Sequence, residues 1–267
     1  MKKKRAKFSE KEVAGYWDKN AESWAKQVWK GWDAYREHLN NPAFLKFIGN
    51  LKGKKVLDAG CGEGYNTRIF SRRGALMVGI DISKKMIAFA REMEKIKPLG
   101  IRYELASFTN ISLFADNSFD AIVSTMALMD SPNYRDAIEE FYRILRPGGE
   151  LFFSISHPCF MTKGYDWIKD EKGNEVKLTV ADYFNNQPRI ECWKFSKSPV
   201  PAEIPPFAIP GFYRTISEYI NPLIRIGFSI KQIHEPRPTE SICRKFPWLR
   251  QWRNHAAIFL YIRTMKP

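Results

Sequence analysis

A short segment of the chain combines an acidic residue with glycines in an arrangement that suits ligand binding. In VLDAGCGEGYNTRIF, which begins as a strand-like run, Asp58 is followed at every second position by Gly60, Gly62 and Gly64. Glycines permit a sharp turn and a close approach of the backbone to a ligand. The dinucleotide-binding pattern needs a glycine where Tyr65 stands, and no Gly-Lys-Ser/Thr sequence follows to make a P-loop. A carboxylate beside the loop repels phosphate, so the loop favours a ligand with a positive centre.

A second acidic residue, Asp81, ends the next apolar run, VGID. Doubly wound folds place a carboxylate here to accept hydrogen bonds from ribose hydroxyls. An aspartate just before Ser83 is also typical of a helix cap, and that alternative gives Asp81 no ligand. S-adenosylmethionine carries a ribose, an ammonium and a sulfonium but no phosphate, and it suits the two acidic residues and the glycine loop together.

The elements that must position these residues are strand-like and helix-like runs in alternation. The helical segments NTRIFSRRG and SKKMIAFAREMEKI alternate with the apolar runs ALMVGID and IRYELA, and the pattern continues through FDAIVST, YRDAIEEFYRILRPGG and ELFFSIS. Strands that are apolar on both faces and alternate with helices predict a parallel sheet covered by helices on each side. We therefore expect an α/β, doubly wound, Rossmann-like fold.

With these motifs the chain resembles the class I S-adenosylmethionine-dependent methyltransferases, in particular the group that includes ubiquinone and menaquinone biosynthesis methyltransferases. The resemblance covers about Val56 to Ile155, with the terminal helix and two strands, and rests on VLDAGCGEG, VGIDIS, FADNSFDAIVS and RILRPGGELFFSI. It implies a seven-stranded, mostly parallel sheet whose last strand is antiparallel. It also implies an enzyme that takes its methyl group from S-adenosyl-L-methionine and releases S-adenosyl-L-homocysteine.

The resemblance also implies which residues bind the cofactor. Asp58 and the three loop glycines would hold the methionine part, and Asp81 would hold the ribose. Ile82 and Met86 would lie against the adenine.

Four further residues are expected at the cofactor. Where the family often has an aspartate for the adenine amino group, this chain has Ser107, followed by Phe108, so a hydrogen bond there would carry no charge. Tyr35 and Arg36 belong to the N-terminal segment that would close the pocket. An arginine there could meet the cofactor carboxylate or an acidic substrate.

We expect a single methyltransferase domain over residues 1–267 with four parts. These are an N-terminal helical extension (1–50), a cofactor-binding core (51–156), a cap insertion (157–213) and the C-terminal part of the sheet (214–267). Prolines in the cap exclude long helices and central strands, and they are Pro188, Pro199, Pro201, Pro205, Pro206 and Pro210. An aromatic- and proline-rich insertion beside the strand ends would enclose a compact acceptor and exclude water.

Methyl transfer is an in-line displacement at a sulfonium carbon, so a base is needed only where the acceptor must lose a proton. His157 is the candidate base, because it follows the fifth strand and its pKa range suits the task. The alternative is a histidine that hydrogen-bonds the cap and shapes the pocket. Cys159 could attack a pyrimidine, but the accompanying motifs are missing, which favours a buried inert cysteine.

The acceptor is the least determined part of the prediction. The net charge of +14 and the basic, aromatic segment RKFPWLRQWR favour RNA, and ten Lys and Arg stand against three Asp and Glu from Pro205 to Pro267. The alternative packs Trp248 and Trp252 over the pocket with the arginines facing water. We predict a small-molecule acceptor, with an RNA methyltransferase as first alternative and a non-catalytic S-adenosylmethionine-binding protein as second.

Bulk composition predicts a soluble, cytoplasmic protein. Hydrophobic residues make up 44% of the chain, and no apolar run approaches the roughly 18 residues of a membrane span. No apolar stretch of signal-peptide length follows the N-terminal lysines. The four cysteines and four histidines show no metal-ligand spacing, so we expect no metal site. The sequence does not indicate an oligomeric state.

Overall fold

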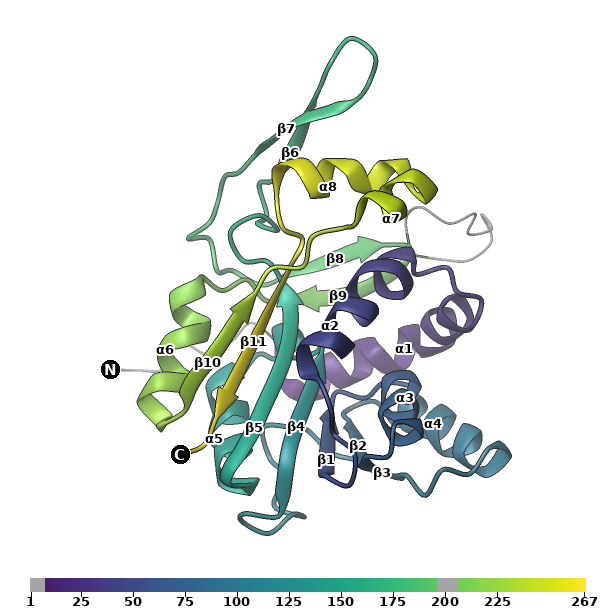
Figure 1. Cartoon of the computed structure of the whole chain (residues 1–267), viewed down its shortest axis with the longest axis vertical. Coiled ribbons are helices and arrows are strands. Elements are labelled where there is room, and N and C mark those ends of the chain that lie inside the picture. The colour runs from purple at the N-terminus through teal and green to yellow at the C-terminus, as the bar shows by residue number, and fades with distance from the viewer. Residues whose placement is uncertain (1–7, 196–205) are drawn as a thin grey trace.

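The structure is a computed structural model of the chain and describes residues 8–195 and 206–267. Its centre is a seven-stranded sheet in the order β10-β11-β5-β4-β1-β2-β3 (Figure 1). The strands are β1 (Lys55–Ala59), β2 (Leu76–Asp81), β3 (Arg102–Leu105), β4 (Phe119–Thr125), β5 (Leu145–Ser156), β10 (Ser229–His234) and β11 (Phe259–Met265). Neighbours run parallel, except that β11 is antiparallel to both β5 and β10. The expected doubly wound sheet with an antiparallel last strand is confirmed.

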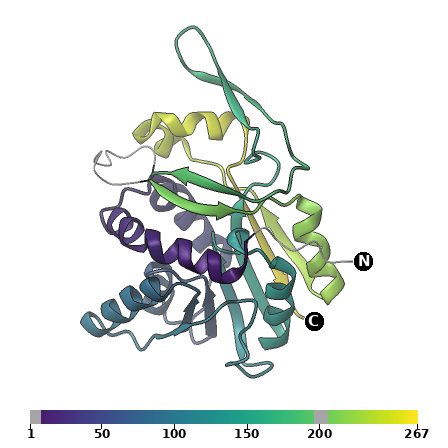
Figure 2. The ribbon, with the colours of Figure 1, turned by 180° about the vertical axis from the view of Figure 1, so that it is seen from behind.

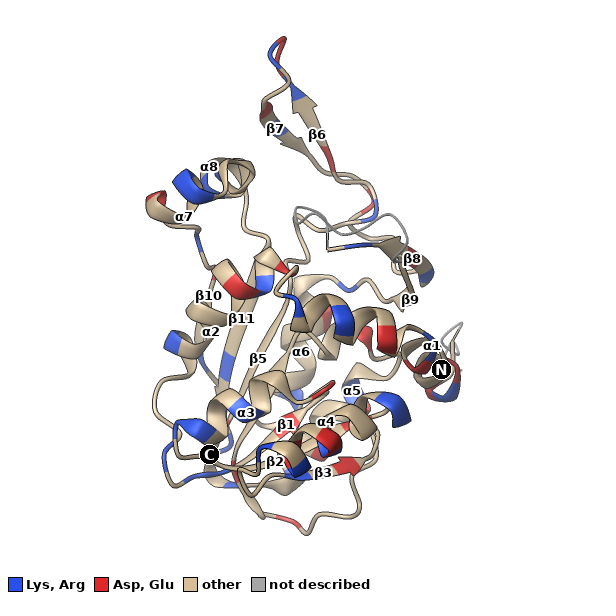
Figure 3. Cartoon of the chain, turned by 90° about the vertical axis from the view of Figure 1, so that its right-hand side faces the viewer, with Lys and Arg blue, Asp and Glu red and all other residues tan. Residues whose placement is uncertain are grey.

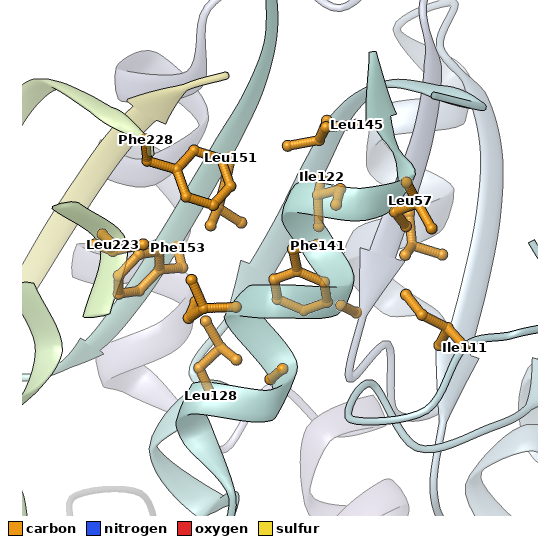
Figure 4. Packing of buried hydrophobic residues seen from close by; sticks show 14 of the residues in the cluster. Leu57, Ile111, Ile122, Leu128, Phe141, Leu145, Leu151, Phe153, Leu223 and Phe228 are labelled. Carbon is orange, nitrogen blue, oxygen red and sulfur yellow. The ribbon is translucent and has the colours of Figure 1, made fainter. Parts of the chain in front are cut away.

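Helices cover both faces of the sheet, because its central strands are apolar on both sides. On one face, buried side chains of α5 (Tyr134–Ile144) and α6 (Ile216–Ile226) pack with those of the strands. Figure 4 shows Phe141 and Leu223 from these helices among Ile122, Leu151 and Phe153 of the strands. The helices packed on the other face are α2 (Asn41–Ile48), α3 (Tyr65–Arg72) and α4 (Lys84–Ile96). This packing holds the carboxyl ends of β1, β2 and β4 side by side.

The N-terminal part is helical and crosses the carboxyl ends of these strands. Helix α1 (Glu10–Trp29) begins with a capping box, in which the Ser9 hydroxyl accepts the Glu12 N–H and the Glu12 carboxylate accepts the Ser9 N–H. A π-helical turn (Arg36–Asn40) then leads directly into α2. Helix α1 packs against α4 and against β9, so it connects a helix beside the sheet with the inserted segment.

The segment 157–213 contains two small antiparallel hairpins. Strands β6 (Asp166–Lys169) and β7 (Glu175–Thr179) form the first, which projects from the body of the molecule in Figures 1 and 2. Strands β8 (Arg189–Trp193) and β9 (Phe207–Gly211) form the second, which lies beside α1. Pro199, Pro201 and Pro205 lie outside the described residues. Pro188, Pro206 and Pro210 flank or belong to the two-stranded β8–β9 sheet.

The segment between β10 and β11 folds into short helices. They are α7 (Glu240–Lys245), a 3₁₀ turn (Pro247–Leu249) and α8 (Arg250–His255). Leu249 and Trp252 of this segment pack into the core. Across the parts of the chain that the structure describes, no helix has the length and apolar character needed to cross a membrane.

Candidate active site

A cavity of about 850 Å³ lies at the carboxyl ends of the central strands. This volume falls within the range of about 300–1,000 Å³ that is usual for small-molecule sites. Residues of helix α1 and of the β8–β9 hairpin also line it. Ten of the predicted cofactor residues line the cavity: Tyr35, Arg36, Asp58, Gly60, Gly62, Asp81, Ile82, Met86, Ser107 and Phe108. Gly64 and His157 do not line it.

The glycine loop joins β1 to α3 in conformations that favour glycine. Gly60 has φ +81°, and a Cβ there would overlap the Cβ of Ala127. Gly64 has φ +82°, and a Cβ there would overlap the hydroxyl of Tyr103. At Gly62 a Cβ would meet no atom within 4 Å, so open space lies beside the backbone. Gly60 and Gly64 thus shape the loop, and the Gly62 backbone is open to a ligand.

Asp58 lies at the end of β1 with only 1% of its surface exposed. The Thr67 hydroxyl donates a 2.6 Å hydrogen bond to Oδ2, and no other hydrogen bond to this carboxylate is present among the described residues. Burial raises the pKa of Asp58 to about 7, although the bond from Thr67 works in the opposite direction. A carboxylate in this position gains from a positively charged ligand, which would restore its ionised form.

Asp81 connects the glycine loop to the start of α4. Its Oδ2 accepts the Gly62 N–H and its Oδ1 accepts the Ser83 N–H, both at 2.9 Å. Burial raises the pKa of Asp81 to about 6, although these two hydrogen bonds act in the opposite direction. Ser83 itself caps α4 by accepting the Met86 N–H at 3.2 Å. The capping role that the sequence left open for Asp81 therefore belongs to Ser83.

The adenine side of the predicted site is formed by residues after β2 and β3. Ser107 accepts the Thr109 N–H at 3.2 Å and contacts the Thr109 hydroxyl at 2.9 Å. Phe108 stands edge-on to Phe141, with ring centroids 6.2 Å apart. Helix α1 closes this side, because Glu10 accepts a hydrogen bond from the Thr109 hydroxyl.

Arg36 reaches the cavity from the π-helical turn. Its guanidinium lies 4.1 Å from the centroid of the Tyr65 ring and 3.7 Å from the Glu63 carboxylate. Its Nε and Nη2 are buried, and no hydrogen-bond partner for them exists among the described residues. The Nε also lies 3.7 Å from the Glu37 carboxylate, so both nitrogens have an acidic neighbour but no hydrogen bond. Buried charged donors without a hydrogen bond are unfavourable, so this position fits a ligand carboxylate such as that of the methionine part of the cofactor.

Tyr35 lies beside Arg36 and meets the C-terminal helices. Its hydroxyl accepts the Trp252 Nε1–H at 3.1 Å, and its ring is edge-on to Trp248, with centroids 4.9 Å apart. Burial raises the pKa of Tyr35 to about 12, so the phenol stays protonated. Both tryptophans of RKFPWLRQWR are thus turned toward the pocket wall.

His157 is held behind the cavity wall. Its Nε2 donates to Glu235 at 2.7 Å, and its Nδ1 accepts the Cys159 N–H at 3.2 Å. The imidazole is buried, which lowers its pKa, while Glu235 acts in the opposite direction. Both ring nitrogens are therefore engaged by protein, and the histidine joins the end of β5 to the segment after β10.

Several polar residues of the cavity were not identified from the sequence. They are Asp33, Thr125, Asp130, Thr162, Glu191 and Arg214. The hydroxyls of Thr125 and Thr162 are buried and have no hydrogen-bond partner among the described residues, so they are free for a ligand. Asp130 had a recognisable signal, because it follows the fourth strand. Glu191 and Arg214 had none, since only the folding of the β8–β9 hairpin brings them to the site.

Comparison with known proteins agrees with this architecture. A family model described as a methyltransferase domain matches residues 57–153. The chain is 35% identical over 137 residues to the ubiquinone biosynthesis O-methyltransferase of Coxiella burnetii (50% of this chain, 58% of that protein). It is 40% identical over 118 residues to the demethylmenaquinone methyltransferase of Tropheryma whipplei (43% and 48%). The alignment therefore spans about half the length of these curated relatives. The crystal structure of an S-adenosylmethionine-dependent methyltransferase from Mesorhizobium loti superposes with a TM-score of 0.69 at 28% identity, over 84% of this chain and 96% of that one.

Proposed function

We propose that this chain, a class I S-adenosylmethionine-dependent methyltransferase, transfers the methyl group to a small molecule bound under the cover that α1 and the β8–β9 hairpin form. The observation that carries this proposal is that α1 and the β8–β9 hairpin are hydrogen-bonded to each other over the strand ends. Asn20 of α1 donates to the Ala208 carbonyl at 3.0 Å and accepts the Ala208 N–H at 3.1 Å. A cavity with such a covering suits a compact molecule better than a polymer.

In this proposal the residues at the ends of β1 and β2 hold the methyl donor. Bound S-adenosylmethionine supplies a methyl group on a sulfonium, ready for in-line displacement. Asp81 accepts hydrogen bonds from the ribose, and Arg36 pairs with the methionine carboxylate through Nε and Nη2, which have no hydrogen-bond partner among the described residues. Asp58 and the backbone of Gly62 provide the acidic and open surface for the ammonium group.

The acceptor half of the cavity is aromatic. Its wall includes Trp17, Trp24, Tyr165, Trp193 and Phe212. Aromatic walls bury a flat ring well and stack with it. Together with the quinone-pathway names of the part-length relatives, this lining supports an aromatic, quinone-like acceptor.

Transfer to RNA is the less favoured alternative. Figure 3 shows Lys and Arg distributed over several helices and strands rather than gathered at one surface. In the basic C-terminal segment, Arg250 and Arg253 face Glu240, at 3.5 Å and 2.7 Å. Trp248 and Trp252 contact Tyr35, so these two rings are not a free stacking surface for bases.

The direct test is incubation of the enzyme with methyl-labelled S-adenosylmethionine and, in parallel, with a metabolite extract and with total RNA. We expect label in low-molecular-weight aromatic compounds and none in RNA above the level of an enzyme-free control. Label found only in RNA would instead identify the enzyme as an RNA methyltransferase. Binding of S-adenosylhomocysteine without transfer to either pool would indicate a non-catalytic binding protein.

A further inference from the structure

We propose that Asp130 accepts the proton of a hydroxyl group on the methyl acceptor, which makes the acceptor a phenol or catechol. This inference rests on the proposed function, because it assigns the chemistry of the acceptor half of the same cavity. Asp130 is not among the residues that the sequence predicted to contact the cofactor. Its basis is the position of Asp130, the groups that surround it and the lack of another suitable base.

Asp130 ends a 3₁₀ turn (Leu128–Asp130) directly after β4 and lines the cavity. Strand β4 is the neighbour of β1, so this turn stands next to the glycine loop, and Ala127 closely approaches Gly60. Residues of the turn pack against β5, α5 and β9. Asp130 is therefore placed between the predicted position of the methyl donor and the aromatic acceptor wall.

The carboxylate of Asp130 is free to bind a ligand. Among the described residues it has no hydrogen bond and no ion pair. Its own N–H donates to the Ala127 carbonyl at 2.9 Å, which fixes the backbone of the turn. Arg214 donates to the carbonyls on either side of it, those of Met129 (3.3 Å) and Ser131. The arginine thus holds the turn through its backbone and leaves the carboxylate oxygens unoccupied.

Three charged groups act on Asp130 from different elements. Glu191 of β8 and Asp81 of β2 repel its negative charge, and Arg214 attracts it. Burial is the largest effect, and the net result raises the pKa of Asp130 well above its ordinary value. A carboxylate with a raised pKa is a stronger base than an exposed one, and it is better matched to the proton of a phenol.

The proposed step balances in atoms and charge. The O–H bond of the acceptor breaks and its proton passes to Asp130. The electron pair on that oxygen forms the bond to the methyl carbon, while the pair of the carbon–sulfur bond goes to sulfur. The negative carboxylate and the positive sulfonium are both neutralised, and Asp130 returns its proton to water after product release.

Other candidate bases are less well placed. His157 lies behind the cavity wall with both nitrogens engaged by protein. Glu191 lines the cavity from the β8–β9 hairpin, but its carboxylate is paired with Arg189 at 3.7 Å. Asp33 accepts the Arg36 N–H at 2.9 Å on the cofactor side. Asp130 alone among these adjoins the carboxyl end of β4.

The test compares the wild type with Asp130→Asn, which keeps the size of the side chain but removes the base. The acceptors are a set of catechols and phenols that includes 4-nitrocatechol, whose phenolate absorbs visible light. We expect methyl transfer in the wild type and a fall in kcat/KM of at least about 100-fold in the variant. The affinity for S-adenosylhomocysteine, measured by calorimetry, should change little. Wild-type kcat/KM should rise with pH as Asp130 loses its proton, and this rise should disappear in the variant.

A matched control and a comparison of two acceptors complete the test. Asp116→Asn changes the same residue type near the opposite end of β4, where Asp116 is 69% exposed and pairs with Arg143, and it should behave as wild type. The loss of kcat/KM in Asp130→Asn should be smaller for 4-nitrocatechol than for catechol, because the more acidic hydroxyl of 4-nitrocatechol ionises without help from a base. Activity of Asp130→Asn within about threefold of wild type would overturn the inference. So would a wild type that binds S-adenosylhomocysteine and methylates none of these hydroxyl compounds, whereas failure to bind S-adenosylhomocysteine would refute the proposed function itself.

Discussion

We expect Asp58 to make the affinity for the cofactor dependent on pH. Its pKa is about 7 in the folded protein against an ordinary value of 3.8, and that of Asp81 is about 6. Pairing with a ligand ammonium requires the ionised carboxylate, so protons and cofactor compete. We predict that calorimetry with S-adenosylhomocysteine shows affinity increasing as pH rises through about 6 to 7 and levelling off above.

The same pKa values affect stability without ligand in the opposite direction. A folded pKa above the unfolded one means that the stabilising contribution is complete below pH 3.8 and is lost as pH rises toward 7.

Asp58→Asn serves as the control for the affinity measurement, because it removes the titrating group while keeping an acceptor for Thr67. A wild-type affinity that does not vary with pH, or an unchanged profile in Asp58→Asn, would remove Asp58 from the cofactor site.

His157 is expected to contribute to stability rather than to proton transfer. His157→Ala leaves the Cys159 N–H without its acceptor and breaks the link to Glu235. Unfolding in urea should show a loss of about 1–3 kcal/mol, with the pH dependence of kcat/KM retained. A variant of normal stability that lost the pH dependence would instead restore the histidine as the base.

At the level of elements, α1 and the β8–β9 hairpin are expected to act together as a cover. Asn20→Ala removes both hydrogen bonds to Ala208. We predict a loss of about 1–3 kcal/mol in the free energy of unfolding and a higher KM for the acceptor, with cofactor affinity little changed. Glu22→Ala, on an exposed position of the same helix, is the control. Equal KM values for Asn20→Ala and Glu22→Ala would show that the cover does not influence acceptor binding.

Some strands and helices of this protein could be predicted from the sequence, and others could not. The strands β1, β2, β4 and β5 could be predicted because burial on both faces leaves continuous apolar runs. Helices α7 and α8 could not, since their sequence has no regular apolar spacing and their stability comes from the burial of Cys243, Leu249 and Trp252. Local propensity is a weak guide wherever tertiary packing supplies most of the stability.

At the level of the whole molecule, the site combines residues from distant parts of the chain. Trp252 donates to Tyr35, and the buried Tyr261 hydroxyl of β11 donates to the Asn40 carbonyl. The N-terminal helices are thereby attached to the last strand of the sheet. They also contact the glycine loop, through the ion pair of Arg36 with Glu63. The cofactor side of the cavity therefore depends on both ends of the described chain.

The sequence by itself determined the doubly wound sheet and the acidic glycine loop after β1, because local runs and short spacings encode both. It also placed Asp81 at the end of β2, and ten of its eleven cofactor residues line the cavity. Only the tertiary structure decided that His157 faces Glu235 and that Asp130, Glu191 and Arg214 line the same cavity. The reason is physical: side-chain direction after a strand and contacts between distant hairpins depend on packing of the whole chain, which no local pattern records.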